Sequence, residues 1–359
     1  MDGFKNVEIR NFRGIEHLKI EDFSRVNVFL GQNSSGKSSV LESLLLLMGP
    51  SNPDLPQTIS AIRSRGYVGF SDLGYMFPNC NWNLKPEFNS EFFDDTKRHL
   101  KLELTYFFDE QSHEKMPNGH LPTTETKTFL NTLKLNFDIE HHQNTSHYES
   151  SLTVNQSGMV TNKKIAEGYL EKNSVAFVSA DMTLSNLVND LVELAKRKQK
   201  DIVTERLKFF DGRITSLEIL NNEAFIGLEG MDQLMAVNMM GDGMRRYLNI
   251  VAASANPMTN IILIDEIDNG LHYSAYKKLW EAIFALATET NKQVFVTTHS
   301  KETLYRLNEM LEEHSEYQDA LRLYTIEKTK LKGHQAYKMT YNGLHEACEN
   351  DIELRSIVL

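Results

Sequence analysis

The octapeptide Gly31-Gln32-Asn33-Ser34-Ser35-Gly36-Lys37-Ser38 constrains this chain more than any other stretch, because it fits G-x-x-x-x-G-K-[ST] with no mismatch. The apolar run VNVFL ends at Leu30, and a leucine-rich segment over 38–48 follows, up to Gly49-Pro50. These flanks predict a buried strand and a helix joined by the loop. The glycines let several backbone N–H groups point inward at phosphate oxygens, and the start of the helix adds its positive end.

The loop predicts that the chain binds a nucleoside triphosphate, with ATP and Mg²⁺ as cofactors. In this chemistry Lys37 supplies positive charge to the β- and γ-phosphates, and the Ser38 hydroxyl is a metal ligand. The predicted cofactor-binding residues of the loop are Gly31, Gln32, Asn33, Ser34, Ser35, Gly36, Lys37, Ser38 and Ser39.

Candidate catalytic groups follow two later apolar runs. Asp265 and Glu266 come directly after IILI, and His299 follows VFVTT. A carboxylate at the carboxyl end of a buried strand lies where a parallel sheet places its ligand site. We therefore expect Asp265 to hold the metal together with Ser38, and Glu266 to orient or deprotonate the attacking water. A neutral His299 would hydrogen-bond the γ-phosphate and fix that water. An acidic turn and a structural histidine are the alternatives.

Strand and helix patterns alternate in the last third of the chain, which predicts a mainly parallel sheet with helices on its faces. Alternating apolar residues over 100–108, 132–140 and 148–160 predict an antiparallel sheet with one solvated face. Residues 50–90 read as irregular, and apolar residues at helical spacing over 184–195 predict a helix that pairs with a second one over 201–210. We expect one α/β domain over 1–359, composed of a nucleotide-binding core (1–50 and 174–359), a β-rich lobe (85–165) and a helical insertion (182–212).

Charge and composition bound the function further. The formal net charge is −11, so a protein that coats DNA with its whole surface is not expected. The basic run over 196–200 could contact nucleic acid or form a solvated helix end, and the histidines between 141 and 147 could form a metal site or an exposed loop.

Cysteine usage and hydropathy indicate the compartment. Two distant cysteines, Cys80 and Cys348, exclude a disulfide framework and fit a reducing environment. The first twenty residues contain no uninterrupted apolar run, and the longest leucine run, Leu44–Leu47, is too short to span a bilayer. We expect a cytoplasmic protein without a membrane partner.

Four segments together resemble the ATP-binding-cassette (ABC) type of ATPase head found in SMC, RecF and OLD (overcoming lysogenization defect) proteins. They are the opening VEIRNFRGIEHLKIEDFSRVNVFLGQNSSGKSS, the segment MMGDGMRR over 239–246, LIDEIDNGLH with a D-loop region over 268–272, and TTHS. The resemblance covers roughly 1–50 and 170–359, and it is nearest to OLD-like AAA-family ATPases. It implies a P-loop NTPase fold with a mainly parallel sheet, an N-terminal antiparallel β lobe and a helical insertion.

The resemblance also implies at least a homodimer, in which Gly241, Asp242 and Gly243 of one protomer close over the nucleotide held by the other. Amides at the start of a helix, freed by the two glycines, could face a γ-phosphate across that interface. Asp242 stands near the place where transporters carry a serine. Because an ionised acid cannot donate to phosphate, we expect it to cap the helix instead.

Three further assignments follow from the family pattern. Either Arg245 or Arg246 supplies a charge to the partner's nucleotide, or both have a surface role. Arg13, in NFRG, reaches the nucleotide of its own chain. Ser71–Phe77 is the nearest candidate for a nucleotide-sensing loop.

OLD proteins often continue into a Toprim nuclease domain, whereas this chain ends at Leu359, soon after its last core strand. The resemblance therefore implies an ATPase head that works with a separate effector, such as a nuclease or toxin, in bacterial anti-phage defence. The alternatives are a RecF-like repair ATPase that binds nucleic acid, and an ATP-dependent dimeriser with negligible turnover.

Overall fold

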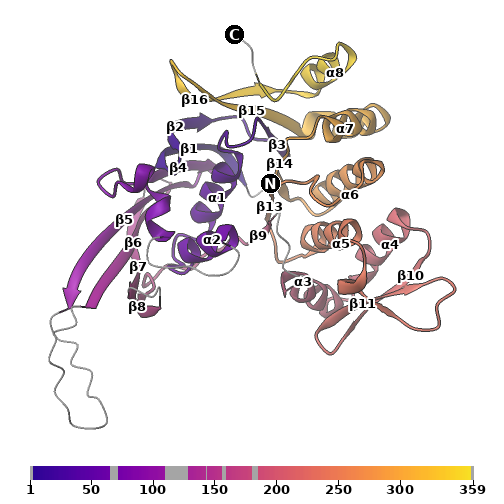
Figure 1. Ribbon diagram of the computed structural model, residues 1–359, viewed down its shortest axis with the longest axis horizontal. Coiled ribbons are helices and arrows are strands. Elements are labelled where there is room, and N and C mark those ends of the chain that lie inside the picture. The colour runs from indigo at the N-terminus through magenta and orange to yellow at the C-terminus, as the bar shows by residue number, and fades with distance from the viewer. Residues whose placement is uncertain are drawn as a thin grey trace, which may run out of the picture.

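The computed structural model describes residues 3–64, 72–109, 128–142, 144–155, 159–179 and 185–356. Its core is a six-stranded sheet in the order β16-β15-β3-β14-β13-β9 (Figure 1). All neighbouring pairs are parallel except β15 with β16, which confirms the mainly parallel sheet and the α/β class. The strands are β3 (Val26–Leu30), β9 (Val175–Val178), β13 (Ile261–Ile264), β14 (Gln293–Thr297), β15 (Leu321–Thr329) and β16 (Gly333–Met339).

Both faces of this sheet are covered, which explains why its central strands β3, β13 and β14 are buried at every position and are mostly apolar. Along β13, Ile262 and Ile264 pack in one hydrophobic cluster with α5, α6 and α7, whereas Ile261 and Leu263 pack in a second cluster with α1. The helices around the sheet are α1 (Lys37–Met48), α5 (Asp242–Ala255), α6 (Tyr276–Glu289), α7 (Lys301–Glu313) and α8 (Tyr341–Glu349). The predicted helix after the loop is therefore confirmed.

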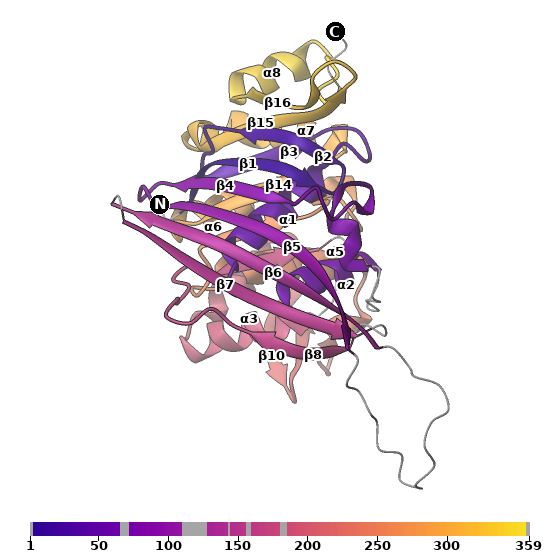
Figure 2. The ribbon, with the colours of Figure 1, turned by 90° about the vertical axis from the view of Figure 1, so that its left-hand side faces the viewer.

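An antiparallel sheet of seven strands, in the order β2-β1-β4-β5-β6-β7-β8, covers the side of the core that carries α1 (Figure 2). The predicted boundary at residue 85 is wrong for this sheet, because the first two strands, expected in the core, pair with β4. The stretch 148–160, expected as one strand, contributes to two. The strands are β1 (Phe4–Phe12), β2 (Ile15–Ile20), β4 (Glu87–Phe92), β5 (Lys97–Asp109), β6 (Thr128–His141), β7 (Asn144–Asn155) and β8 (Val160–Lys164).

A buried arginine joins the antiparallel sheet to α1. Arg98 of β5 donates to the carbonyl of Leu47 at 2.8 Å, in the last turn of α1, and pairs with Glu171 at 2.8 Å. A cation at the carboxyl end of a helix is favoured by the helix dipole. The antiparallel sheet thereby holds the helix that begins at the phosphate loop.

Two segments differ from the prediction. Residues 50–90, read as irregular, contain α2 (Leu55–Ser64), two 3-10 helices, η1 (Asp72–Met76) and η2 (Pro78–Cys80), and β4. The insertion contains the expected pair α3 (Ser185–Lys196) and α4 (Lys200–Phe210), but it continues into a small sheet that was not predicted. Its strands are β10 (Ile214–Leu220), β11 (Glu223–Leu228) and β12 (Met235–Ala236).

Short 3-10 helices connect the remaining elements, namely η3 (Val237–Met239), η4 (Tyr273–Ala275) and η5 (Ser315–Ala320). Among the residues described, no helix is both long and apolar enough to cross a membrane.

Candidate active site

The phosphate loop joins β3 to α1 at the carboxyl edge of the core sheet. Gly31 has φ of 148°, and a Cβ there would lie 2.5 Å from the carbonyl oxygen of Ile326 and 2.5 Å from Ser35 Oγ. Gly36 is the N-cap of α1 with φ of 101°. Both positions therefore require glycine, and the resulting tight loop leaves the first amides of α1 available to an anion.

Lys37 lies within this loop and is only 8% exposed. Its Nζ donates to the carbonyl oxygens of Gly31 and Gln32, each at 2.8 Å. Burial lowers the pKa of Lys37, while the carboxylates of Asp265, Glu266 and Asp268 act in the opposite direction. A cation buried in the loop at the start of α1 can bind the phosphates of a nucleotide.

Asp265 is bound by hydroxyls from two other elements. Its Oδ1 accepts from Ser38 Oγ at 2.9 Å and from Thr297 Oγ1 at 2.6 Å. Ser38 lies in the first turn of α1 and Thr297 ends β14, the strand between β3 and β13. Oxygen donors are the ligands that Mg²⁺ prefers, so the hydroxyl of Ser38 and the carboxylate of Asp265 fit the predicted metal.

Glu266 adopts a backbone conformation that residues with a side chain rarely adopt, with φ of 49°. Its N–H donates to Thr297 Oγ1 at 2.8 Å, and the N–H of the next residue, Ile267, donates to the Thr297 carbonyl at 3.1 Å. The turn after β13 is thus fixed to the end of β14. A residue held in this way is typical of functional sites.

Arg246 lies beneath the same turn. It is 1% exposed, and its Nη2 donates to the carbonyl oxygens of Asp265 at 2.5 Å and Glu266 at 3.0 Å. Its Nη1 donates to the carbonyl of Ser179, which follows β9. Burial lowers the pKa of Arg246 to about 10, so it stays charged at neutral pH. Arg246 therefore does not lie on the surface, and the expectation that it serves a partner's nucleotide is wrong because its guanidinium is buried against its own chain.

His299 lies at the same edge of the sheet, two residues beyond β14. Its Nε2 is 3.9 Å from Oδ2 of the buried Asp268, whose Oδ1 accepts from Thr298 Oγ1 at 2.5 Å. The imidazole remains about half exposed, with 46% of its side chain accessible. The ring is therefore accessible to a ligand from solvent, and its contact with the γ-phosphate stays a prediction.

The Gly-Asp-Gly segment forms the start of α5, with Gly241 as the N-cap. Gly241 and Asp242 are exposed, and a Cβ at Gly243 would lie 3.2 Å from the carbonyl of Gly270 in the D-loop region. Asp242 does not cap the helix as expected, because it occupies the first helical position and its carboxylate pairs with Arg245. The helix start thus presents amides to solvent.

Arg13 lies against α1, and in the described part of the chain its recorded hydrogen bonds and ion pairs do not involve the phosphate loop. Its Nε is 2.7 Å from Oε2 of the buried Glu42, which also binds Arg63 at 2.5 Å. Burial lowers the pKa of Arg13, and within the described residues its Nη2 has no hydrogen-bond partner. A role toward the nucleotide stays a prediction.

The candidate nucleotide-sensing loop is described only in part. Ser71 lies outside the described residues, while η1 contacts Arg13 through the carbonyl of Met76, which accepts from the Arg13 N–H at 2.9 Å.

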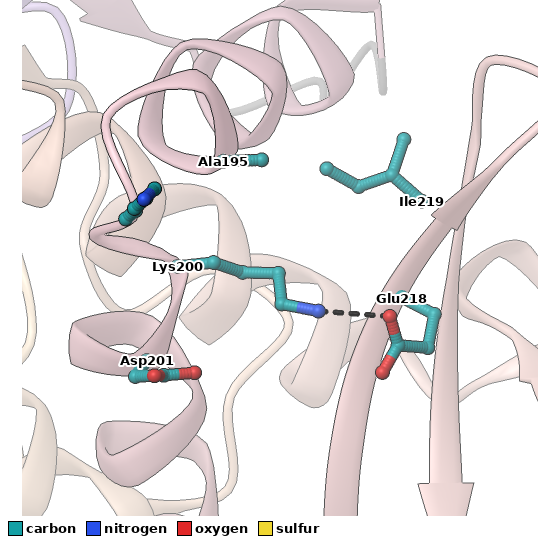
Figure 3. A pocket seen from close by; sticks show the side chains of 6 residues that line it. Ala195, Lys200, Asp201, Glu218 and Ile219 are labelled. Carbon is teal, nitrogen blue, oxygen red and sulfur yellow. Dashed lines mark hydrogen bonds and ion pairs between the residues drawn. The ribbon is translucent and has the colours of Figure 1, made fainter.

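Two of the four basic residues over 196–200 pair with acids of the same chain. Lys196 binds Glu193 at 2.6 Å, and Lys200 binds Glu218 at 2.8 Å across a surface pocket between α3, α4 and β10 (Figure 3). None of the residues that line this pocket belongs to the phosphate loop. Among the described residues His141, His142 and His147 do not form a metal-binding group, and His147 binds Asp138 instead.

Two residues of the site were not predicted. Thr297 lies in VFVTTHS, and its hydroxyl at the end of an apolar run is the sequence signal that could identify it as a site residue. The sequence indicates Arg246 only as a surface or interface group, because arginine is rarely buried.

A family model described as "AAA domain, putative AbiEii toxin, Type IV TA system" matches residues 26–304. An ATP/GTP phosphatase of Helicobacter pylori is 25% identical over 334 residues, which cover 86% of this chain and 88% of that protein. The DNA replication and repair protein RecF of Lactococcus lactis is 44% identical, but over only 43 residues and 12% of each chain.

Among solved structures, an Smc head bound to the C-winged helix domain of ScpA has a TM-score of 0.50 and 11% identity, and the match covers 94% of this chain and 98% of that one. At this identity the likeness describes the fold.

Proposed function

The chain belongs to the AAA-domain family whose model spans residues 26–304, and from this premise we propose that it is an Mg²⁺-dependent, dimeric ATPase switch that controls a separate effector. The family model and the Helicobacter pylori relative support the ATPase activity, and the Smc head structure supports the P-loop fold of the SMC/RecF group. The metal, the dimer and the effector are the proposed parts.

The single observation that carries the proposal is the convergence on one sheet edge of Lys37, Asp265 and Glu266. Lys37 binds the β- and γ-phosphates, while Ser38 and Asp265 hold Mg²⁺, which supplies charge neutralisation at the phosphates. Glu266 orients or deprotonates the water, and His299 hydrogen-bonds the γ-phosphate. Ser38 and Asp265 are already in contact at 2.9 Å, which favours a shared metal.

The exposed start of α5 supports the dimer. Gly241 and Asp242 face solvent, and the apolar Met239 just before them is 78% exposed. A helix start that has no side-chain cap can bind the γ-phosphate held by a second chain. Hydrolysis at such an interface converts ATP into a change of assembly.

The effector is proposed from family features. The matched family is described as containing a toxin of a toxin–antitoxin system, and the resemblance to OLD-like ATPases points to a nuclease or toxin in anti-phage defence. A pull-down from the native host with ATP-bound protein tests this part. Recovery of DNA without a protein effector would favour the alternative.

A RecF-like repair ATPase is the second candidate, because of the 43-residue match to RecF. It requires a basic groove, whereas the chain carries a net charge of −11, and two residues of its basic run, Lys196 and Lys200, are paired with Glu193 and Glu218. The third possibility, a dimeriser with negligible turnover, requires Glu266 to be dispensable.

Glu266→Gln separates these alternatives. We expect phosphate release to fall by about 10²-fold or more while an ATP-bound dimer accumulates. Glu223→Gln, an exposed acid of β11, is the matched control and should behave as wild type. Unchanged turnover in Glu266→Gln would contradict the catalytic assignment, and a monomer in saturating ATP would contradict the switch.

A further inference from the structure

Arg246 reaches from α5 to the turn Asp265–Glu266 after β13, called the catalytic turn below. It stands in the second turn of α5, and it donates to three backbone carbonyls, those of Ser179, Asp265 and Glu266. Its Nε is buried without a hydrogen-bond partner among the described residues. Buried charged groups can often be replaced by apolar side chains at little cost in stability, so burial alone is weak evidence that Arg246 serves stability.

The contact matters because of the strain at Glu266. This residue has φ of 49°, and its two peptide groups are bound by side chains from two different elements. Thr297 of β14 accepts from its N–H at 2.8 Å, and Arg246 of α5 donates to its carbonyl at 3.0 Å. Removing either hydrogen bond lets the turn relax toward an ordinary backbone conformation, which redirects the Glu266 carboxylate.

We propose that Arg246 is a positioning residue that transmits the placement of α5 to the turn at Asp265–Glu266, so that the water is activated only when the start of α5 is engaged. This inference rests on the proposed function, in which Glu266 activates the water and Gly241–Gly243 meet a second chain. A helix is stiff over one turn, so a shift at Gly243 reaches Arg246 directly.

Lys292 offers a matched control at the other end of the same helix. It is 3% exposed, and its Nζ donates to the carbonyls of Ser254 at 2.6 Å and Asn256 at 2.5 Å. Like Arg246 it is a buried cation bound to backbone carbonyls, but none of these belongs to the catalytic turn. Lys292→Met should lower the urea midpoint and leave turnover within about twofold of wild type.

The experiment compares Arg246→Met, Arg246→Lys and Lys292→Met for urea unfolding, ATP affinity, ATP-dependent sedimentation and steady-state kinetics. We expect both Arg246 variants to bind ATP and assemble as wild type does, with KM nearly unchanged and kcat lower by about 10²-fold. Arg246→Lys keeps the charge and much of the volume of the side chain, so its kinetics can be measured even if Arg246→Met does not fold. A kcat of Arg246→Lys equal to that of Lys292→Met, or a parallel loss of assembly and turnover, would overturn the proposal.

The same substitutions in the Glu266→Gln background separate this inference from the function on which it rests. If Arg246 acts through Glu266, the double variant hydrolyses ATP no more slowly than Glu266→Gln in a single-turnover assay. A further independent loss would overturn the inference. Full turnover in Glu266→Gln alone would instead remove the proposed function, whatever Arg246 does.

Discussion

Thr297→Val tests the arrangement of the catalytic edge through a single oxygen atom. Thr297 is completely buried, and its hydroxyl donates to Asp265 at 2.6 Å while accepting from the Glu266 N–H at 2.8 Å. Valine has nearly the same shape, so the core around position 297 stays filled. The substitution therefore removes two hydrogen bonds without opening a cavity.

The two lost hydrogen bonds set the size of the expected change in stability. Losing a hydrogen bond to an ionised carboxylate costs about 1.5–3 kcal/mol, and leaving the Glu266 N–H unpaired costs about 1–3 kcal/mol. Because both losses fall on one turn and partly overlap, we expect the free energy of unfolding to fall by about 3 kcal/mol. Release of the strained turn should also lower kcat by about 10²-fold.

Urea denaturation and phosphate release at saturating ATP measure the two effects. Thr297→Ser is the control, because it keeps the hydroxyl and loses only a methyl group, at a cost of about 1 kcal/mol. Its turnover should stay close to wild type. If Thr297→Val matches Thr297→Ser in both assays, the reasoning about the Asp265–Glu266 turn is refuted.

Three other substitutions address the loop and its surroundings. Gly31→Ala should abolish ATP binding in calorimetry, since its Cβ would lie 2.5 Å from the Ile326 carbonyl; unaltered affinity would contradict the loop geometry. Lys37→Ala should likewise bind no ATP, and wild-type affinity would remove the phosphate-loop assignment. Burial lowers the pKa of His334, whose ring lies beside Gly36, so below pH 6.5 the folded chain takes up fewer protons than the unfolded chain and loses stability as the pH falls. His334→Leu should show a smaller fall in its urea midpoint between pH 7.5 and about 5.5 than wild type, and an equal fall would contradict this assignment.

The sequence predicts the elements of the site that depend on local patterns. The loop at 31–38 carries its own chemistry, and Asp265, Glu266 and His299 follow strands whose apolar runs are unmistakable. Because parallel strands end at a common edge, these groups could be placed together before any strand order was known.

The remaining features depend on contacts between residues far apart in the chain. Pairing of β1 with β4 joins segments about eighty residues apart, and no local pattern distinguishes this partner from a core strand. Arg246 reads as a surface group because charge usually lies outside, and only the fold shows the backbone carbonyls that it binds. The positive φ of Glu266 follows from the same long-range contacts.

The central claim is that two chains complete one ATP site, with the phosphate loop of one facing the start of α5 of the other. An experimental structure of Glu266→Gln with ATP and Mg²⁺ tests it most directly. We predict the triphosphate in the loop over 31–38, the metal between Ser38 and Asp265, and Gly241–Gly243 of a second chain at the γ-phosphate. A γ-phosphate open to solvent, or covered by a different surface, would contradict the account.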